Sequence, residues 1–229
     1  MKAKVLIKRL ISLIFGRSIV SINYDLLKDK VVSFDIFDTL ILRKCEKPSD
    51  VFNIMEQRSY QRIGVNLTGF AKKRKQSERM ARAIKKDSEI TLDEIYCYMP
   101  EYSTKVSREV LKEFEIETEM SECIANREML NLYNRLIENG TKVFLISDMY
   151  LSKRDVEKIL NNCGIVGYQK LYVSSDSKMT KSSGKLFGQV VTDNNLEKKN
   201  MIHIGDNPKG DFFVPKYRNN IAAILYKRC

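Results

Sequence analysis

The sequence predicts an α/β fold, a doubly wound parallel sheet interrupted by an all-helical insertion. Two patterns predict it. Short, continuously apolar runs alternate with helical spacing from residue 31 onward, and a long charged stretch separates the first two of these runs. Continuously apolar strands that alternate with helices are typical of a parallel sheet covered on both faces. With 229 residues, the chain is long enough for a domain with a smaller one attached.

Five apolar runs are the predicted strands of this sheet. They cover residues 31–36, 141–147, 170–175, 200–206 and 220–226. A helix over residues 152–160 follows the second strand, with Ser152 and Asp155 spaced like a capping box. A short helix over residues 184–191 follows the third strand. This order of strands and helices is the one that parallel pairing requires.

The stretch between the first two strands has a different character, because it is highly charged and helically spaced. Its apolar residues recur three, four and six positions apart, as at Leu111, Phe114, Met120, Ile124, Leu130, Tyr133 and Leu136. A shorter helix begins in "TLDEIYCYM", where Thr91 and Glu94 form a second capping box. We therefore expect three parts, listed by residue number: an N-terminal segment (1–27), an α/β core (28–47 and 140–229) and the helical insertion (48–139).

The N-terminal segment, residues 1–27, is basic and partly apolar. Its apolar stretch, residues 10–15, is too short to span a bilayer, and no small-residue cleavage site is evident. Two interpretations stay open. The segment is either a helix lying on an anionic membrane surface or a helix that packs on the body of the protein or on a partner.

Composition limits the class of protein. With 43% apolar and 30% charged residues the chain resembles a soluble globular protein. Its five cysteines are scattered without a CxxC spacing, which favours reduced thiols in the cytoplasm over disulfides or a zinc site. The net charge of +11 favours polyanions, including phosphorylated metabolites. No arginine-rich motif with interleaved aromatic residues occurs, so we expect no nucleic-acid partner.

Polar residues stand at the ends of the predicted strands, where ligands bind in open parallel sheets. They are Asp35 after the first strand, Ser147 and Asp148 after the second, Lys181 beyond the third, and Asp206 with Asp211 after the fourth. Together they would supply a carboxylate nucleophile, a hydroxyl group, an ammonium group and further carboxylates.

This set of side chains suits phosphoryl transfer. Asp35 can attack phosphorus and form an aspartyl-phosphate. Neighbouring carboxylates repel one another unless a cation lies between them, and hard oxygen ligands favour Mg²⁺. Ser147 and Lys181 can each hold one phosphoryl oxygen, while the metal neutralises charge on the others.

Taken in order, these motifs resemble those of the haloacid dehalogenase (HAD) superfamily from residue 31 to about 225. The four are "DIFDT" beginning at Asp35, Ser147 in "FLISD", Lys181 six residues before Phe187, and "HIGDNPKGD" with Asp206 and Asp211. The resemblance implies a Rossmann-like core and a helical type-one cap that closes over the site and selects the substrate. It also implies that Asp35, the backbone carbonyl of Phe37, Asp206 and Asp211 bind Mg²⁺.

The pair "FDIFDTL" and "PSDVF" resembles in particular the uncharacterised HAD-like hydrolases found with bacterial surface-polysaccharide genes. This resemblance implies a role in polysaccharide biosynthesis and a small sugar or polyol phosphate as substrate. We therefore expect a Mg²⁺-dependent phosphomonoester hydrolase.

Phe37 departs from the pattern, since phosphatases of the superfamily carry an aspartate there as general acid and base. In one reading, Asp38 or a residue of the insertion replaces that acid, or the leaving group needs little help. In a second, the protein is a metal-independent dehalogenase, a branch that has an aromatic ring at this position but typically lacks the Gly205-Asp206 pair. In a third, the fold serves as a catalytically weak binding or regulatory module.

Several site residues also have a purely structural interpretation. Asp38 and Thr39 are suited to an Asx-type turn, and Asp211 to holding the site lysine. Arg43 lies where the chain enters the insertion and is a candidate for binding a substrate anion. The single histidine, His203, lies within a predicted strand, where we expect a core or supporting residue and no catalytic base. Lys178 and Lys185 are the rivals of Lys181, whose spacing to Phe187 favours it.

Overall fold

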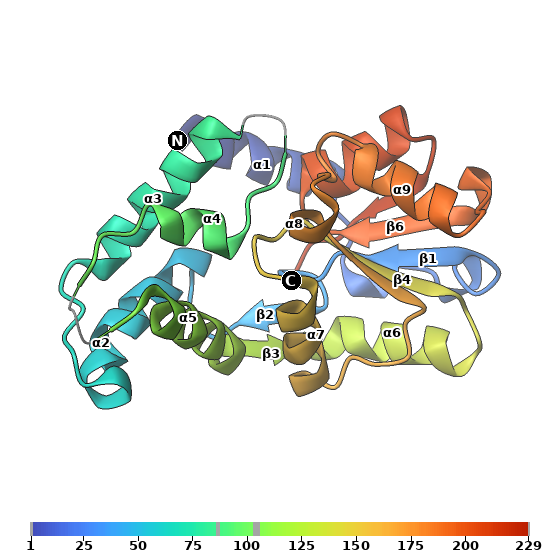
Figure 1. Ribbon diagram of the computed structural model, residues 1–229. Helices are drawn as coiled ribbons and strands as arrows, with labels where there is room; N and C mark the ends of the chain where they lie inside the picture. The colour runs from blue at the N-terminus through green and yellow to red at the C-terminus, as the bar shows by residue number, and fades with distance from the viewer. Residues whose placement is uncertain (1, 86–87, 103–105, 229) are drawn as a thin grey trace.

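The computed structural model describes residues 2–85, 88–102 and 106–228. A five-stranded parallel sheet forms its centre, in the order β5-β4-β1-β6-β7 (Figure 1). The strands are β1 (Val31–Phe34), β4 (Val143–Ser147), β5 (Lys170–Val173), β6 (Met201–Gly205) and β7 (Ala222–Leu225). The predicted α/β fold with five parallel strands is confirmed.

The strand order reverses beside β1. From β1 the chain adds β4 and β5 on one side and then β6 and β7 on the other. The carboxyl ends of β1 and β6 therefore flank the topological switch point, which is where open sheets of this type bind ligands.

Helices cover both faces of the sheet. Successive side chains of a strand point to opposite faces, so Val143 and Leu145 of β4 pack on α6 (Arg127–Glu138) and α7 (Lys153–Asn162), whereas Phe144 and Ile146 pack on α9 (Lys185–Asp193). Figure 1 shows α6 and α7 on one side of the sheet and α9 on the other. Each face is sealed by its own apolar cluster.

The predicted helix starts can be checked against their hydrogen bonds. Thr91 and Glu94 form the predicted capping box at α4 (Leu92–Cys97), since each side chain accepts the other's backbone N–H, at 3.2 and 2.8 Å. At α7 only half of the predicted capping box forms. The Ser152 Oγ accepts the Asp155 N–H at 3.2 Å, but the Asp155 carboxylate accepts the Ser152 hydroxyl, at 2.6 Å, in place of its N–H. The third strand ends before its predicted limit of residue 175. Ser174 begins the short helix α8 (Ser174–Ser177), where its Oγ accepts the Met149 N–H at 2.9 Å.

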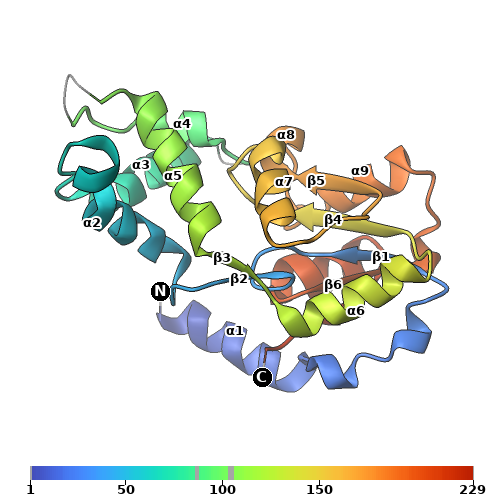
Figure 2. The same cartoon turned by 90° about the horizontal axis from the view of Figure 1, so that it is seen from below.

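The insertion is a group of helices to one side of the sheet, joined to it through two short strands (Figure 2). Its helices are α2 (Val51–Ile63), α3 (Phe70–Ile84), α4 and α5 (Arg108–Glu122), and the antiparallel strands β2 (Ile41–Arg43) and β3 (Cys123–Ala125) form the link. The remaining short helical turns are η1 (Ile19–Ser21), η2 (Tyr24–Leu26), η3 (Pro48–Asp50), η4 (Lys198–Asn200) and the longer η5 (Pro208–Arg218).

Helix α6 differs from the rest of the predicted insertion, residues 48–139. Its Tyr133 ring packs edge-on against Phe34 of β1, at 5.9 Å between centroids, and Met129 and Leu136 are fully buried. The chain thus returns to the sheet after β3, so α6 packs on the core although it precedes the predicted boundary at residue 139. Apolar spacing alone does not reveal which partner a helix face covers.

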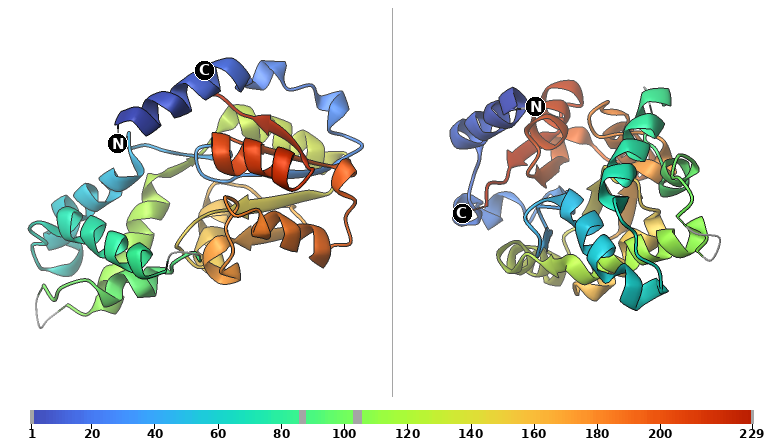
Figure 3. Two further views of the ribbon diagram at one scale, coloured as in Figure 1. Left: turned by 90° about the horizontal axis from the view of Figure 1, so that it is seen from above. Right: turned by 90° about the vertical axis from the view of Figure 1, so that its left-hand side faces the viewer.

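Helix α1 (Lys2–Phe15) is attached at the edge of the molecule beside β7 (Figure 3). Phe15 contacts the rings of Phe212 and Phe213, at 5.9 and 6.1 Å between centroids. Arg17 then donates its N–H to the Leu225 carbonyl at 2.8 Å. Among the described residues, no helix has the length and apolar character needed to cross a membrane.

Candidate active site

A cavity of about 340 Å³ opens at the carboxyl ends of the strands. Its walls come from the loops after β1, β4 and β6, the start of the insertion and the segment around Lys181. The lining residues are Asp35, Phe37, Asp38, Arg43, Pro48, Ser147, Asp148, Met149, Lys181, Ser182, Asp206, Asn207, Lys209, Gly210 and Asp211. All residues that the sequence analysis names as catalytic, phosphate-binding or metal-binding candidates therefore meet at one cavity.

Asp35 lies directly after β1, where a tight loop fixes its carboxylate. Its N–H donates to the Ile204 carbonyl of β6 at 2.9 Å, and the Thr39 hydroxyl donates to its Oδ2 at 3.2 Å. The Ile36 carbonyl accepts the N–H groups of Leu40 and Ile41, both at 2.9 Å, which closes the loop. Thr39 thus orients Asp35, a role beyond the turn that its sequence position predicts.

Lys181 brings a positive charge into this group of acids. Its ammonium Nζ lies 2.6 Å from Asp211 Oδ1 and is also ion-paired with Asp35 Oδ1. Its own N–H donates to Asp148 Oδ1 at 2.8 Å, which ties the lysine segment to the end of β4. Burial lowers the pKa of Lys181, but the carboxylates of Asp211 and Asp35 outweigh burial and hold the pKa above its ordinary value. The ammonium therefore stays charged although the side chain is buried.

Asp211 is held from several sides. Besides Lys181, its Oδ1 lies 3.2 Å from Nε2 of His203, and its Oδ2 accepts the Asn207 N–H at 2.8 Å. Ser33 Oγ lies 2.8 Å from Nδ1 of the same histidine, so a buried chain runs from β1 through His203 to Asp211. Burial opposes ionisation of Asp211, but Lys181 and then His203 lower its pKa below the ordinary range. These contacts favour the interpretation that Asp211 positions Lys181.

Burial lowers the pKa of His203 and keeps its ring neutral. Its ring also packs edge-on against Phe187, at 4.9 Å between centroids. His203 is thus a supporting core residue, as its place in a strand predicts. Its two polar contacts are not visible in the sequence, because Ser33 and Asp211 come from other elements.

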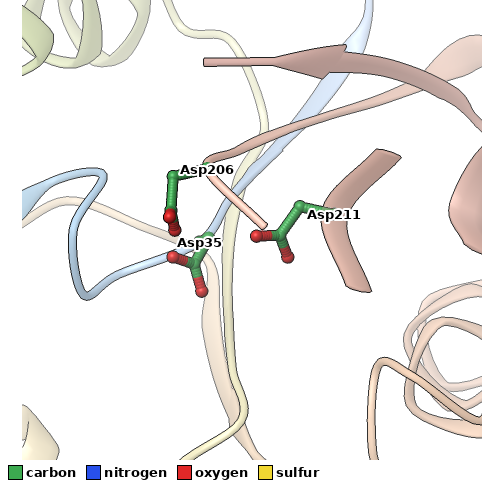
Figure 4. A group of neighbouring side chains, drawn as sticks. All are labelled: Asp35, Asp206 and Asp211. Atoms are coloured by element: carbon green, nitrogen blue, oxygen red, sulfur yellow. The ribbon is translucent and has the colours of Figure 1, made fainter. Parts of the chain in front are cut away.

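Three carboxylates approach one another at the switch point. Each of Asp35, Asp206 and Asp211 offers an oxygen, and these oxygens all lie within 4.8 Å of one another. Figure 4 shows the three side chains converging from the end of β1, the end of β6 and η5. Burial, followed by the charges of Asp211 and Asp206, raises the pKa of Asp35 well above its ordinary value, although Lys181 opposes the shift. Such a set of hard oxygens fits a divalent cation, which would relieve the crowding of negative charge.

Phe37 and Arg43 form one wall of the cavity. The Arg43 guanidinium lies over the Phe37 ring, 4.6 Å from its centroid. Glu119 of α5 binds Arg43 through Nε at 2.7 Å and Nη2 at 2.6 Å, and both partners are nearly buried. The arginine therefore joins the insertion to the loop after β1, and its charge is already balanced by Glu119.

The rivals of Lys181 lie elsewhere. Lys178 pairs with Glu94 at 3.7 Å, and Lys185 is exposed at the start of α9. Sequence reasoning placed Asn207 at this strand end but missed Lys209, which also lines the cavity. The signal for Lys209 was its place in "GDNPKGD", directly after the fourth strand.

No family model and no curated protein matches the chain. Solved structures do match it. The HAD family enzyme bt-2542 from Bacteroides thetaiotaomicron is 19% identical, with a TM-score of 0.58 over 86% of this chain and 93% of its own. YfnB from Bacillus subtilis, assigned to the HAD hydrolases and solved with magnesium, is 15% identical with a TM-score of 0.56 over 87% of each chain. A 2-haloacid dehalogenase from Pseudomonas syringae pv. Tomato DC3000 is 14% identical with a TM-score of 0.55 over 86% of each chain. The chain thus has the fold of the HAD hydrolases, and its neighbours leave the reaction open.

Proposed function

From the HAD hydrolase fold and the geometry of the cavity, we propose that the protein is a Mg²⁺-dependent phosphomonoester hydrolase. The observation that carries the proposal is the convergence of Asp35, Asp206 and Asp211 on one point, with the Lys181 ammonium paired to Asp35 and Asp211. An ester with a phosphoryl group brings the negative charge that a lysine and a bound cation would neutralise.

In the proposed reaction Asp35 is the nucleophile. One carboxylate oxygen attacks phosphorus, the bond from phosphorus to the ester oxygen breaks, and the leaving oxygen takes up a proton. Water then attacks phosphorus, which releases inorganic phosphate and restores Asp35. Thr39 holds the second oxygen of Asp35, so the attacking oxygen keeps its direction.

Asp35 and Asp206 would hold the cation, together with the Phe37 carbonyl. When bound, Mg²⁺ would supply charge neutralisation at the phosphoryl oxygens. Ser147 and Lys181 would hold the remaining phosphoryl oxygens, and Asp148 would keep the Lys181 segment in place. Asp211 would act chiefly on Lys181, since its carboxylate is already bound by Lys181, His203 and the Asn207 N–H.

The proton for the leaving group needs a donor other than Phe37. Asp38 lines the cavity, and its backbone is held in the left-handed region at φ 63° with its N–H bonded to the Ile41 carbonyl at 2.8 Å. We assign this role to Asp38. Asp38→Asn should then slow hydrolysis of alkyl phosphates far more than that of aryl phosphates, whose leaving groups need no proton.

The substrate in this proposal is a small phosphorylated metabolite, such as a sugar or polyol phosphate of polysaccharide synthesis. A cavity of about 340 Å³ accommodates a ligand of that size. The site-lining Lys209 adds positive charge at the rim. The sugar class rests on the sequence resemblance alone.

A phosphate-release screen over a panel of phosphorylated metabolites, with and without Mg²⁺, tests the proposal. We expect metal-dependent release by the wild type, loss of release in Asp35→Asn, and unchanged release in the control Asp25→Asn, which alters an exposed carboxylate in η2. Chloride release from a haloacid without metal would instead identify a dehalogenase, which Phe37 favours and the acidic cluster disfavours. Binding of phosphorylated ligands without any turnover would identify a binding module.

A further inference from the structure

Helix α1 exposes a continuous apolar face that the proposed chemistry does not use. Leu6, Leu10 and Leu13 are 70%, 58% and 66% exposed, and the neighbouring Ile7 and Ile14 are exposed to a similar degree. At 3.6 residues per turn these five positions share one side of the helix. We call them the apolar face of α1.

The helix is held to the body by its C-terminal end. Phe15 packs against Phe212 and Phe213, and Arg17 is bonded in both directions to the C-terminal strand, through the Leu225 carbonyl and the Lys227 N–H. Figure 3 shows α1 along the outer edge of the molecule. The attachment therefore leaves the apolar face of α1 directed to solvent.

The N-terminal region that contains α1 is positively charged. Residues 1–24 contain five lysines and arginines and no aspartate or glutamate. Lys227 adds to this charge, since its Cβ lies close to Gly16 at the end of the helix.

We propose that α1 docks on an anionic lipid bilayer, lying in the plane of the surface with its apolar face in the acyl region. An apolar face flanked by basic residues is the pattern of interfacial helices, and its 14 residues lie flat over about 21 Å. A second copy of this chain is the less favoured occupant, because pairing two such helices would bring two sets of five basic residues together. Anionic headgroups neutralise that charge.

Co-sedimentation of the full chain with lipid vesicles tests this assignment. The vesicles contain phosphatidylcholine alone or with phosphatidylglycerol. We expect binding to the anionic vesicles that weakens as salt rises, because each basic residue near the surface contributes about fivefold to the partition. Leu10→Glu should reduce partition at least about tenfold.

Val166→Glu is the matched control. It introduces the same charge at a residue equally exposed, 58% for both, in the loop between α7 and β5. This variant should bind vesicles like the wild type.

Three results would overturn the assignment. They are no sedimentation of the wild type with anionic vesicles, equal binding by Leu10→Glu, and equal binding to uncharged vesicles. Sedimentation velocity tests whether a second copy occupies the face instead. A wild-type dimer that Leu10→Glu dissociates, in a protein that does not bind vesicles, would show that it does.

Discussion

Gly205 allows the chain to carry Asp211 against the end of β6. A Cβ at this position would lie 2.5 Å from Asp211 Cγ and 2.7 Å from its Cβ. Real side chains do not approach that closely, so any larger residue must displace Asp211 from His203 and Lys181. The glycine of "HIGD" is thus required by packing and not by its backbone angles.

Gly205→Ala should therefore destabilise the protein by about 1–3 kcal/mol, the usual cost of overpacking a filled site. Urea unfolding measures this change. Gly188→Ala in α9 is the control, since its Cβ meets nothing within 4 Å, and a helical glycine-to-alanine change is neutral or stabilising by about 1 kcal/mol. Equal stabilities of Gly205→Ala and the wild type would contradict the packing argument.

The raised pKa of Asp35 predicts a pH dependence of stability. Between the ordinary value of 3.8 and the raised value, folded Asp35 binds more protons than unfolded Asp35. Its contribution to the free energy of unfolding is therefore fully present below about pH 4 and is lost as pH rises through the folded pKa. In metal-free buffer, Asp35→Asn should gain stability relative to the wild type as pH rises across that window.

Urea unfolding of both proteins at a series of pH values measures this difference. Asp25→Asn removes an exposed carboxylate and is the control for the loss of one negative charge. If the wild type instead became more stable relative to Asp35→Asn as pH rises, that result would contradict a raised pKa of Asp35. Added Mg²⁺ should favour the wild type, since a bound cation relieves the repulsion.

At the residue scale, the sequence predicts which side chains meet but not how they hold one another. Asp35, Ser147 and Asp206 were predictable because each ends a parallel strand. The hold of His203 on Asp211 depends on side-chain directions in two separate elements, β6 and η5. No local pattern encodes those directions.

Arg74 of α3 organises the helical insertion. Its guanidinium is fully buried and binds Glu115 of α5 through Nε and Nη2, at 2.8 and 2.7 Å. It also lies over the rings of Phe52 and Tyr150, 4.6 and 4.9 Å from their centroids. Because Tyr150 belongs to the loop after β4, this arginine joins the insertion to the core near the site.

Arg74→Met should cost about 3–5 kcal/mol, because it leaves the buried Glu115 carboxylate without its positively charged partner. The double variant Arg74→Met/Glu115→Leu should recover part of that loss. Urea unfolding of the wild type, both single variants and the double variant gives a double-mutant cycle, which measures the interaction energy between Arg74 and Glu115.

The matched control is Arg62→Met. Arg62 makes the same two-bond contact to Glu117 between α2 and α5, but both side chains are about half exposed. It should cost at most about 1 kcal/mol. Similar costs for Arg74→Met and Arg62→Met would show that burial does not set the strength of these pairs.

At the element scale, strands and helix N-caps were predictable because their signals are local. The five apolar runs and the Thr91–Glu94 box lie where the sequence predicts them. The placement of α6 was not predictable, since a helix with one apolar face packs equally well on a sheet or on other helices. Only the structure shows that α6 packs on the sheet, through the contact of Tyr133 with Phe34.

At the scale of the whole molecule, the site is a product of topology. Segments near residues 35, 148, 181 and 206 lie far apart in the chain and meet because β5, β4, β1 and β6 are adjacent and parallel. The sequence predicts this meeting as soon as the strands are read as parallel. It does not predict the exposed face of α1, because the surface to which a terminal helix attaches is set by contacts such as Phe15 on Phe212.

The central claim is that the carboxylates of Asp35 and Asp206, which meet at the switch point, bind a divalent cation. Calorimetric titration of Mg²⁺ into the purified protein tests it most directly. Wild type should bind one Mg²⁺ per chain, Asp206→Asn should bind at least about tenfold more weakly, and Asp25→Asn should bind like the wild type. A wild type that binds no Mg²⁺, or an Asp206→Asn variant that binds it equally well, would contradict the account.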